Sequence, residues 1–381
     1  MIQLERLLDL SHPIDVRGER CTHRWNKESA CSLCLDGCPT QALALEEGEI
    51  VLDEARCVRC EFCFRVCPTD VFHGSNEAVM LLKSVAALSP RRSLSLACIN
   101  EGVTDAAIAA DAEAVVQLRT CLASLGRAAY AGLAALGVEA IHVRLDQCET
   151  CPLGTLRPHI EAVCREAQAL VEIDVTVDGE IDPEFEPARA EPDSRPVVRT
   201  YQPKVSRRAF LRRPASAAQV PDDLLPPEPT ADKTPPVERR FLLHFLEQIP
   251  ASRRGDGTFL PDIGVTDSCT ACGVCATVCP NGALGLEKEL TPEQEHFRLN
   301  FDPASCTACN LCVELCPPQA LAFTGARSLK EAEPVTLLAG DLKRCKRCRA
   351  HFAGPGTLCP ACDFRRKNPF GSVPRPFAFP V

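Results

Sequence analysis

Four closely spaced cysteine groups in this chain each end in a Cys-Pro pair, and their spacing points to metal chemistry. Three groups follow the pattern C-x2-C-x2-C-x3-C-P and begin at Cys57, Cys269 and Cys306. The fourth group is longer, because nine residues separate Cys21 from Cys31. Thiolates in this pattern ligate cubane iron–sulfur clusters: three come from one loop, and the cysteine before the proline serves a neighbouring cluster. Because each group supplies a ligand to its neighbour's cluster, the groups should occur in pairs. They do occur in two pairs, one near each end of the chain.

The composition excludes several other kinds of protein. The chain has 381 residues, a formal net charge of −9 and only 5% aromatic residues, which makes it a poor candidate for binding nucleic acid. Most of its 25 cysteines fall at metal-ligand spacings, in a chain too long for a small disulfide-bonded secreted protein. No run approaches the ~18 apolar residues of a membrane helix, and the N-terminus is unlike a signal peptide. We expect a cytoplasmic protein with reduced thiols and no membrane insertion.

The distribution of cysteines, apolar runs and prolines predicts five segments and an α+β fold. Two ferredoxin-like two-cluster modules flank a small parallel α/β domain, and a zinc-ribbon or rubredoxin-like knuckle follows. The linker holds 12 of the chain's 32 prolines, so we expect it to be an extended, poorly ordered tether. The predicted segments, in chain order, are a two-cluster module over 17–75, an α/β domain with a cysteine rim over 90–180, the linker over 183–236, a second two-cluster module over 237–330, and the knuckle with its tail over 340–381.

Both cysteine modules resemble bacterial two-cubane ferredoxins in these Cys-Pro groups. The resemblance implies a pseudo-twofold β-α-β repeat around two [4Fe-4S] clusters in each module, and so four clusters in the chain. In the first module it assigns one cluster to Cys21, Cys31, Cys34 and Cys67, and the other to Cys57, Cys60, Cys63 and Cys38. In the second it assigns one cluster to Cys269, Cys272, Cys275 and Cys316, and the other to Cys306, Cys309, Cys312 and Cys279.

The first group departs from the regular cysteine spacing at Cys21, so the ligands of its cluster have alternatives. Cys21 closes its cluster from a longer loop, or the site holds a three-iron cluster, or His23 replaces the fourth thiolate. The insertion also carries Trp25, the only tryptophan. It is either a surface loop, or a partner contact or a shield that tunes the potential of this cluster.

Secondary structure within the modules follows the apolar pattern. Residues 40–56 predict a short helix and then two strands joined at a Glu-Gly turn, and residues 281–305 repeat this plan with a longer hairpin. Ahead of the second module, 237–249 has the spacing of an amphipathic helix. We expect that helix to pack on the second ferredoxin module, and a partner-binding helix is the alternative.

Four cysteines of the middle segment follow predicted strands. Cys98, Cys121 and Cys148 each come after a short apolar run, and Cys151 lies just beyond. Strands that alternate with helices predict a parallel sheet, whose carboxyl edge is the usual ligand site. The order of strands and cysteines resembles the small iron–sulfur subunit family that links hydrogenases to heterodisulfide reductases. A further iron–sulfur cluster, a zinc site or redox dithiol at Cys148 and Cys151, and ordinary buried cysteines all remain open. Cys164, on a predicted apolar helix face, is expected to be a core thiol.

The last cysteines form two C-x2-C pairs, Cys345 with Cys348 and Cys359 with Cys362. Two such pairs predict a tetrahedral four-thiolate site, for which zinc is the first choice and a rubredoxin-like iron the competitor. Because four protein thiolates leave no open position, a zinc ion there would be structural.

No P-loop or dinucleotide fingerprint is present, and no catalytic residue is assigned. The sequence therefore predicts a polyferredoxin: an electron-transfer subunit of a low-potential oxidoreductase such as a formate dehydrogenase or hydrogenase, with redox subunits as donor and acceptor. Two alternatives stay open. One is an assembly or maturation factor for a metalloenzyme, and the other is a disulfide-reducing subunit that uses the middle cysteines.

Overall fold

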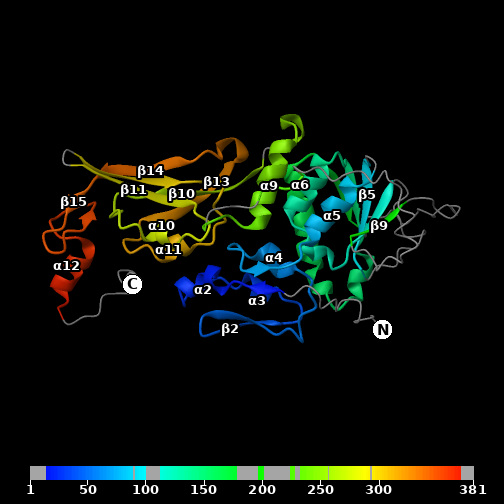
Figure 1. The fold of residues 1–381 in the computed structure, drawn as a ribbon, viewed down its shortest axis with the longest axis horizontal. Helices are drawn as coiled ribbons and strands as arrows, with labels where there is room; N and C mark the ends of the chain where they lie inside the picture. The colour runs from blue at the N-terminus through cyan, green and yellow to red at the C-terminus, as the bar shows by residue number, and fades with distance from the viewer. Residues whose placement is uncertain are drawn as a thin grey trace. The chain divides into compact units, whose positions relative to one another are not determined.

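A computed structural model of the chain describes residues 14–88, 91–99, 112–177, 196–200, 224–227, 232–255, 257–291 and 294–369 (Figure 1). The chain folds into two compact units. The first unit comprises Met1–Glu19, Ser32–Glu228 and Val237–Gly257. The second unit comprises Arg20–Cys31, Pro229–Pro236 and Thr258–Val381.

A five-stranded parallel sheet organises the first unit, as the alternation of strands and helices predicted. Its order is β8-β7-β5-β6-β9, with β5 at Ser93–Ala97, β6 at Ala114–Gln117, β7 at Ala140–Val143, β8 at Asp174–Val177 and β9 at Val197–Arg199. All four residues of β6 are buried, as expected for a central strand of a parallel sheet.

The edge strand β9 lies inside the segment predicted to be an unstructured linker. It pairs in parallel with β6, and the following residue, Thr200, is buried. The expectation of an extended tether is therefore wrong for Val197–Arg199. Most of the remaining linker lies outside the described residues.

Four helices accompany the sheet: α5 (Glu77–Ala86), α6 (Arg127–Ala135), α7 (Arg157–Leu170) and α9 (Val237–Gln248). The apolar face of α9 packs on α6 through Leu242, Phe245 and Leu246, all of them buried. Gly132 of α6 permits this approach, since a Cβ there would press into Phe245. The prediction that this helix packs on the second ferredoxin module is therefore wrong, because its apolar stripe completes the core of the α/β domain.

The cysteine-rich part of the first unit consists of short elements. They are β1 (Asp15–Val16), α3 (Leu33–Asp36), β2 (Leu43–Glu46), β3 (Glu49–Leu52), α4 (Phe62–Val66) and β4 (Phe72–His73). β2 and β3 form the predicted hairpin around Glu47-Gly48. The helix predicted after Cys38 is absent from this described segment. Helices α3 and α4 instead contain cysteines, because the tight loops that carry the thiols run directly into a helical turn.

The described residues of the second unit form two antiparallel sheets ahead of its C-terminal knuckle. Its elements are α2 (Thr22–Trp25), β10 (Thr258–Val265), α10 (Val274–Val278), β11 (Leu284–Leu290), β12 (Glu295–Phe301), α11 (Leu311–Glu314), β13 (Leu321–Ser328) and β14 (Val335–Asp341). β10 pairs with β13, and β11-β12-β14 form a three-stranded sheet. Cysteines belong to the core itself, where Ile263, Leu299 and Phe301 pack with four buried thiols.

A small cysteine knuckle ends the described chain. It comprises β15 (Lys343–Arg344), β16 (His351–Phe352) and α12 (Pro360–Lys367). Short 3-10 helices occupy Gly18–Arg20, Leu122–Ser124, Asp146–Glu149, Gly154–Leu156, Ala251–Arg253 and Leu329–Glu331. Among the described residues, none of the helices combines the length and apolar character needed to cross a membrane. The tail beyond residue 369 lies outside the described residues.

Candidate metal centres

One four-cysteine set gathers around a cavity in the first unit. Cys38, Cys57, Cys60 and Cys63 line a cavity of about 20 Å³. Cys38 comes from the turn before β2, Cys57 and Cys60 come from the loop that enters α4, and Cys63 lies in the first turn of α4. Burial raises the pKa of the Cys60 thiol to about 12, and burial with the charges of the neighbouring thiols raises that of Cys63. Four buried thiolates are stable in the charged form only when a cation neutralises them.

Two further sets gather in the second unit. Cys269, Cys272, Cys275 and Cys316 line a second cavity of about 20 Å³. Cys279, Cys306 and Cys312 are buried in one core cluster, and the charge of Cys279 also acts on the thiol of Cys309. Burial is the main cause that raises the pKa of Cys309 to about 12. The structure thus brings together three of the four cysteine sets predicted for the modules.

The backbone after each Cys-Pro cysteine repeats one conformation. The third residue after the cysteine is left-handed each time: Gln41, Asp70, Gly282 and Gln319 have φ of 50°, 60°, 70° and 52°. The next residue then donates its N–H to the cysteine sulfur: Ala42 to Cys38 at 3.3 Å, Val71 to Cys67 at 3.4 Å, Ala283 to Cys279 at 3.3 Å and Ala320 to Cys316 at 3.2 Å. Hydrogen bonds to ligating sulfurs stabilise thiolates and tune cluster potentials, so this backbone fits the predicted metal centres.

The stretched first group has a different backbone. In the three regular groups the residue after the second cysteine is left-handed, as Glu61 is with φ of 58°. Ser32, at the corresponding place after Cys31, has φ of −129°. Cys21 and Cys31 belong to the second unit and Cys34 and Cys67 to the first, so their shared cluster remains a prediction.

The insertion between Cys21 and Cys31 is folded onto the second unit. The buried His23 ring has its Nε2 atom 2.7 Å from the carbonyl oxygen of Cys31. Asn26 donates to the carboxylate of Glu314 at 2.8 Å. Trp25 is 40% exposed, which agrees with a surface position for the tip of the insertion.

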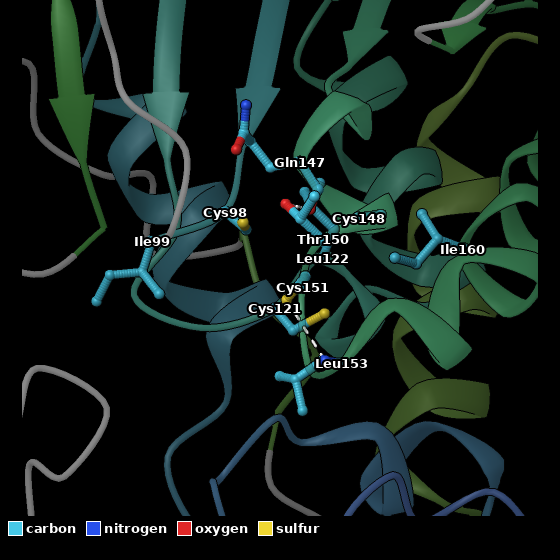
Figure 2. A pocket seen from close by; sticks show the side chains of 10 residues that line it. All are labelled: Cys98, Ile99, Cys121, Leu122, Gln147, Cys148, Thr150, Cys151, Leu153 and Ile160. Carbon is cyan, nitrogen blue, oxygen red and sulfur yellow. Dashed lines mark hydrogen bonds between the residues drawn. The ribbon is translucent and has the colours of Figure 1, made fainter. Parts of the chain in front are cut away.

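The four middle cysteines surround a larger cavity of about 110 Å³ (Figure 2). They follow β5, β6 and β7, whose carboxyl ends meet at one edge of the sheet. The cavity is lined by Cys98, Ile99, Cys121, Leu122, Gln147, Cys148, Thr150, Cys151, Leu153 and Ile160. The sequence placed these cysteines on one rim, and the structure brings all four to one cavity.

Tight backbone turns fix the Cys148 and Cys151 side of this cavity. Leu153 donates its N–H to the sulfur of Cys151 at 3.4 Å. Gly154 is required because a Cβ there would overlap the carbonyl oxygen of Cys148. Burial is the main cause that raises the pKa of the Cys121 thiol. Cys164 lies apart, buried in α7 as predicted, where its S–H donates to the Tyr130 hydroxyl at 3.4 Å.

The knuckle brings its four predicted ligands together. The sulfurs of Cys345, Cys348, Cys359 and Cys362 all lie within 4.8 Å of one another. Burial opposes ionisation of Cys345, but backbone N–H groups of Cys348 and Cys359 donate to its sulfur and lower its pKa to about 6. Four convergent sulfurs with this spacing fit a tetrahedral metal ion.

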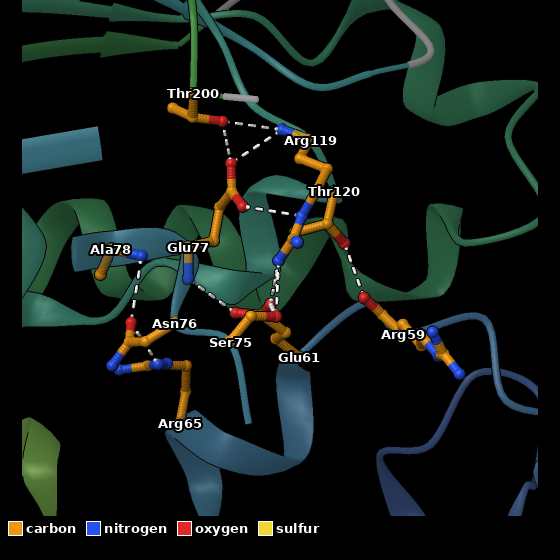
Figure 3. Close-up of polar contacts among 10 residues, drawn as sticks. All are labelled: Arg59, Glu61, Arg65, Ser75, Asn76, Glu77, Ala78, Arg119, Thr120 and Thr200. Carbon is orange, nitrogen blue, oxygen red and sulfur yellow. Dashed lines mark hydrogen bonds and ion pairs between the residues drawn. The ribbon is translucent and has the colours of Figure 1, made fainter. Parts of the chain in front are cut away.

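A buried polar network, which the sequence did not reveal, lies beside two of these cysteine loops (Figure 3). The Arg119 guanidinium lies 3.2 Å from the Glu61 carboxylate and 3.4 Å from that of Glu77. Glu77 also accepts from the backbone N–H of Arg119 at 2.7 Å and from the hydroxyl of Thr200. Charged residues in a sequence normally indicate solvated surface, so no local pattern marks these as buried partners.

Comparison with known families agrees with the geometry of the modules. The pattern of the 4Fe-4S dicluster domain matches residues 29–71 and 268–320. These two segments are therefore 4Fe-4S dicluster domains of the ferredoxin type, and the chain is an iron–sulfur protein.

Two curated relatives share part of the chain. The electron transport protein YsaA of Escherichia coli (strain K12) is 30% identical over 106 residues, which cover 26% of this chain and 65% of YsaA. NADH-quinone oxidoreductase subunit I 2 of Rhodopseudomonas palustris (strain BisB18) is 36% identical over 58 residues, which cover 14% of this chain and 34% of that subunit. The chain thus spans less than two thirds of each of these relatives.

Proposed function

We propose that this chain is a multi-centre electron carrier: a relay subunit that passes single electrons between a low-potential oxidoreductase, such as a formate dehydrogenase or hydrogenase, and an acceptor. The observation that carries the proposal is the repeated pairing of a cysteine sulfur with the backbone N–H four residues later, in both dicluster domains. The names of the two relatives, an electron transport protein and an oxidoreductase subunit, support the same role.

Four [4Fe-4S] clusters are proposed for the four predicted cysteine sets. Each cluster, when bound, changes by one electron without exchange of ligands. The protein holds the thiolates, excludes water by burial, and donates backbone hydrogen bonds to sulfur. Apolar side chains such as Leu299 and Phe301 pack with the thiols of the second unit, which keeps the local dielectric constant low.

A further iron–sulfur centre is proposed for Cys98, Cys121, Cys148 and Cys151. Its support is the convergence of four thiols on one cavity whose other lining residues include Ile99, Leu122, Leu153 and Ile160. For Cys345, Cys348, Cys359 and Cys362 we propose a structural zinc ion, supported by the mutual approach of their sulfurs.

Reductive titration of the anaerobically purified full chain, followed by electron paramagnetic resonance, tests the carrier role. We expect reversible uptake of about five electrons per chain, one for each proposed cluster. Metal centres that take up no electrons reversibly would favour the assembly-factor alternative. If instead the chain turns over a disulfide substrate and Cys148→Ser abolishes that turnover while the ferredoxin signals persist, the catalytic alternative replaces the relay.

A further inference from the structure

The loop that carries Cys60 and the loop that carries Cys121 are bonded to one another inside the first unit. The hydroxyl of Thr120 donates to the carbonyl oxygen of Arg59 at 2.8 Å. The guanidinium of Arg119 donates to the carboxylate of Glu61 at 3.2 Å. The two residues that flank Cys60 are thus bonded to the two residues that precede Cys121 (Figure 3).

This contact is buried and supported from several sides. Thr120 is 4% exposed and Glu61 is 3% exposed. The second oxygen of Glu61 accepts from the backbone N–H of Glu77 at 2.9 Å, and Ser75 accepts from Arg119 at 2.6 Å. Few of these groups are free to reorient, so the contact fixes the two loops relative to one another.

A second contact joins the Cys60 loop to α7, whose Ile160 lines the cavity of the middle cysteines. The ring of Phe62, next to Cys63, meets the ring of His159 on α7 edge-on, with 4.8 Å between centroids. The two cysteine sets are therefore close neighbours.

We propose that Thr120 and Arg119 are positioning residues of an internal electron junction, which holds the centre on Cys38, Cys57, Cys60 and Cys63 directly beside the centre on Cys98, Cys121, Cys148 and Cys151. The inference rests on the proposed function, since it requires the middle centre to exist. One electron leaves one centre and enters the other, and no covalent bond is made or broken and no proton moves. The α/β domain then carries one redox centre of the electron-transfer path and is not an appended structural domain.

Spin–spin interaction between the two reduced centres is the direct readout. The full-length chain is reduced anaerobically, and the relaxation of its ferredoxin-type signals is compared with that of Cys121→Ser, which lacks the middle centre. We expect faster relaxation in the unmodified chain. Thr120→Val, which deletes the hydroxyl at nearly constant volume, weakens the interaction while the iron content is unchanged, and Thr120→Ser retains it. Thr176→Val is the matched control, because it removes an exposed hydrogen bond to His142 on another strand.

Each outcome decides the question. If Cys121→Ser lowers the iron content but leaves the relaxation of the ferredoxin signals unchanged, the junction is refuted and the middle centre stands. If Cys121→Ser leaves the iron content unchanged, the middle centre and the junction both fail. If Thr120→Val does not fold, Thr120→Ser and Arg119→Lys replace it, because each keeps a hydrogen-bond donor at its contact. Both variants must then show a spin–spin interaction like that of the unmodified chain. Loss of the interaction in both, with full iron content, would overturn the fixed geometry.

Discussion

The guanidinium of Arg119 lies 3.2 Å from the carboxylate of Glu61, and this ion pair joins a cysteine loop of the dicluster domain to the parallel sheet domain. The same guanidinium lies 3.4 Å from the fully buried carboxylate of Glu77. Burial raises the pKa of Glu61 to about 7, against the lowering effect of the positive charges of Arg65 and Arg119. Arg119 therefore contacts two carboxyl groups that have almost no access to water.

Replacing Arg119 with methionine leaves both carboxylates without that cation. We expect the free energy of unfolding to fall by about 3 kcal/mol, because removing one partner of a buried ion pair strands the other charge. Urea unfolding of the intact chain, followed by a signal from the first unit, measures this loss of unfolding free energy. Arg92→Met is the matched control: its partner Glu139 is 3.9 Å away and both side chains are exposed, so its effect stays within about 0.5 kcal/mol. Equal effects of the two variants would contradict a buried ion pair.

His159 predicts a pH dependence of stability. Burial lowers the pKa of His159 in the folded chain, whereas the unfolded residue titrates near its ordinary value. Below that value, about 6.5, the unfolded state binds more protons, so stability falls as the pH decreases. His159→Phe removes this titrating group. Its stability is expected to fall less steeply between pH 6.5 and pH 5 than that of the unmodified chain, in buffered denaturant titrations. If the stability of the two proteins changes in parallel with pH, His159 is not the group that causes this pH dependence.

Gly154 is the residue on which the middle cavity's backbone depends. Gly154→Ala forces a Cβ against the carbonyl oxygen of Cys148, and overpacking of this kind costs about 1–3 kcal/mol. We expect loss of about two to four iron per chain from the middle centre, with the dicluster signals unchanged. Gly18→Ala is the control, since no atom lies within 4 Å of its added Cβ. Full iron content in Gly154→Ala would show that the turn does not shape the site.

The regular three-cysteine loops were predictable because their information is local. The residues between their thiols adopt left-handed turns, as Arg59 and Glu61 do. The parallel sheet of the middle domain was also predictable, since short apolar runs precede Cys98, Cys121 and Cys148 and helical patterns follow them. The order of its strands was not predicted.

Long-range choices were not predictable in the same way. The amphipathic pattern of α9 showed that one face would be buried, but it could not show that α6 would cover it. β9 has only three residues and lies among prolines, so its local sequence does not predict a strand. It becomes a strand because it pairs with β6. Arg119 and Glu61 are 58 positions apart, and nothing in either local sequence marks them as partners.

The knuckle is expected to lose its metal independently of the iron–sulfur centres. Cys359→Ser removes one of four ligands, so about one zinc per chain should be lost and amide exchange over 343–367 should accelerate, while the iron content is unchanged. Cys164→Ser is the matched control, because this buried thiol bonds to Tyr130 and lies outside every proposed metal site. Retention of zinc by Cys359→Ser would contradict the four-thiolate site.

The most direct test of the relay is the number of iron, acid-labile sulfide and zinc atoms per chain after anaerobic purification. Four cubanes, one middle centre and one knuckle predict about 18 to 20 iron, a matching amount of sulfide and about one zinc. A count near 16 iron would remove the middle centre and leave four cubanes. A count far below 16 iron, in protein never exposed to oxygen, would contradict the multi-centre electron carrier itself.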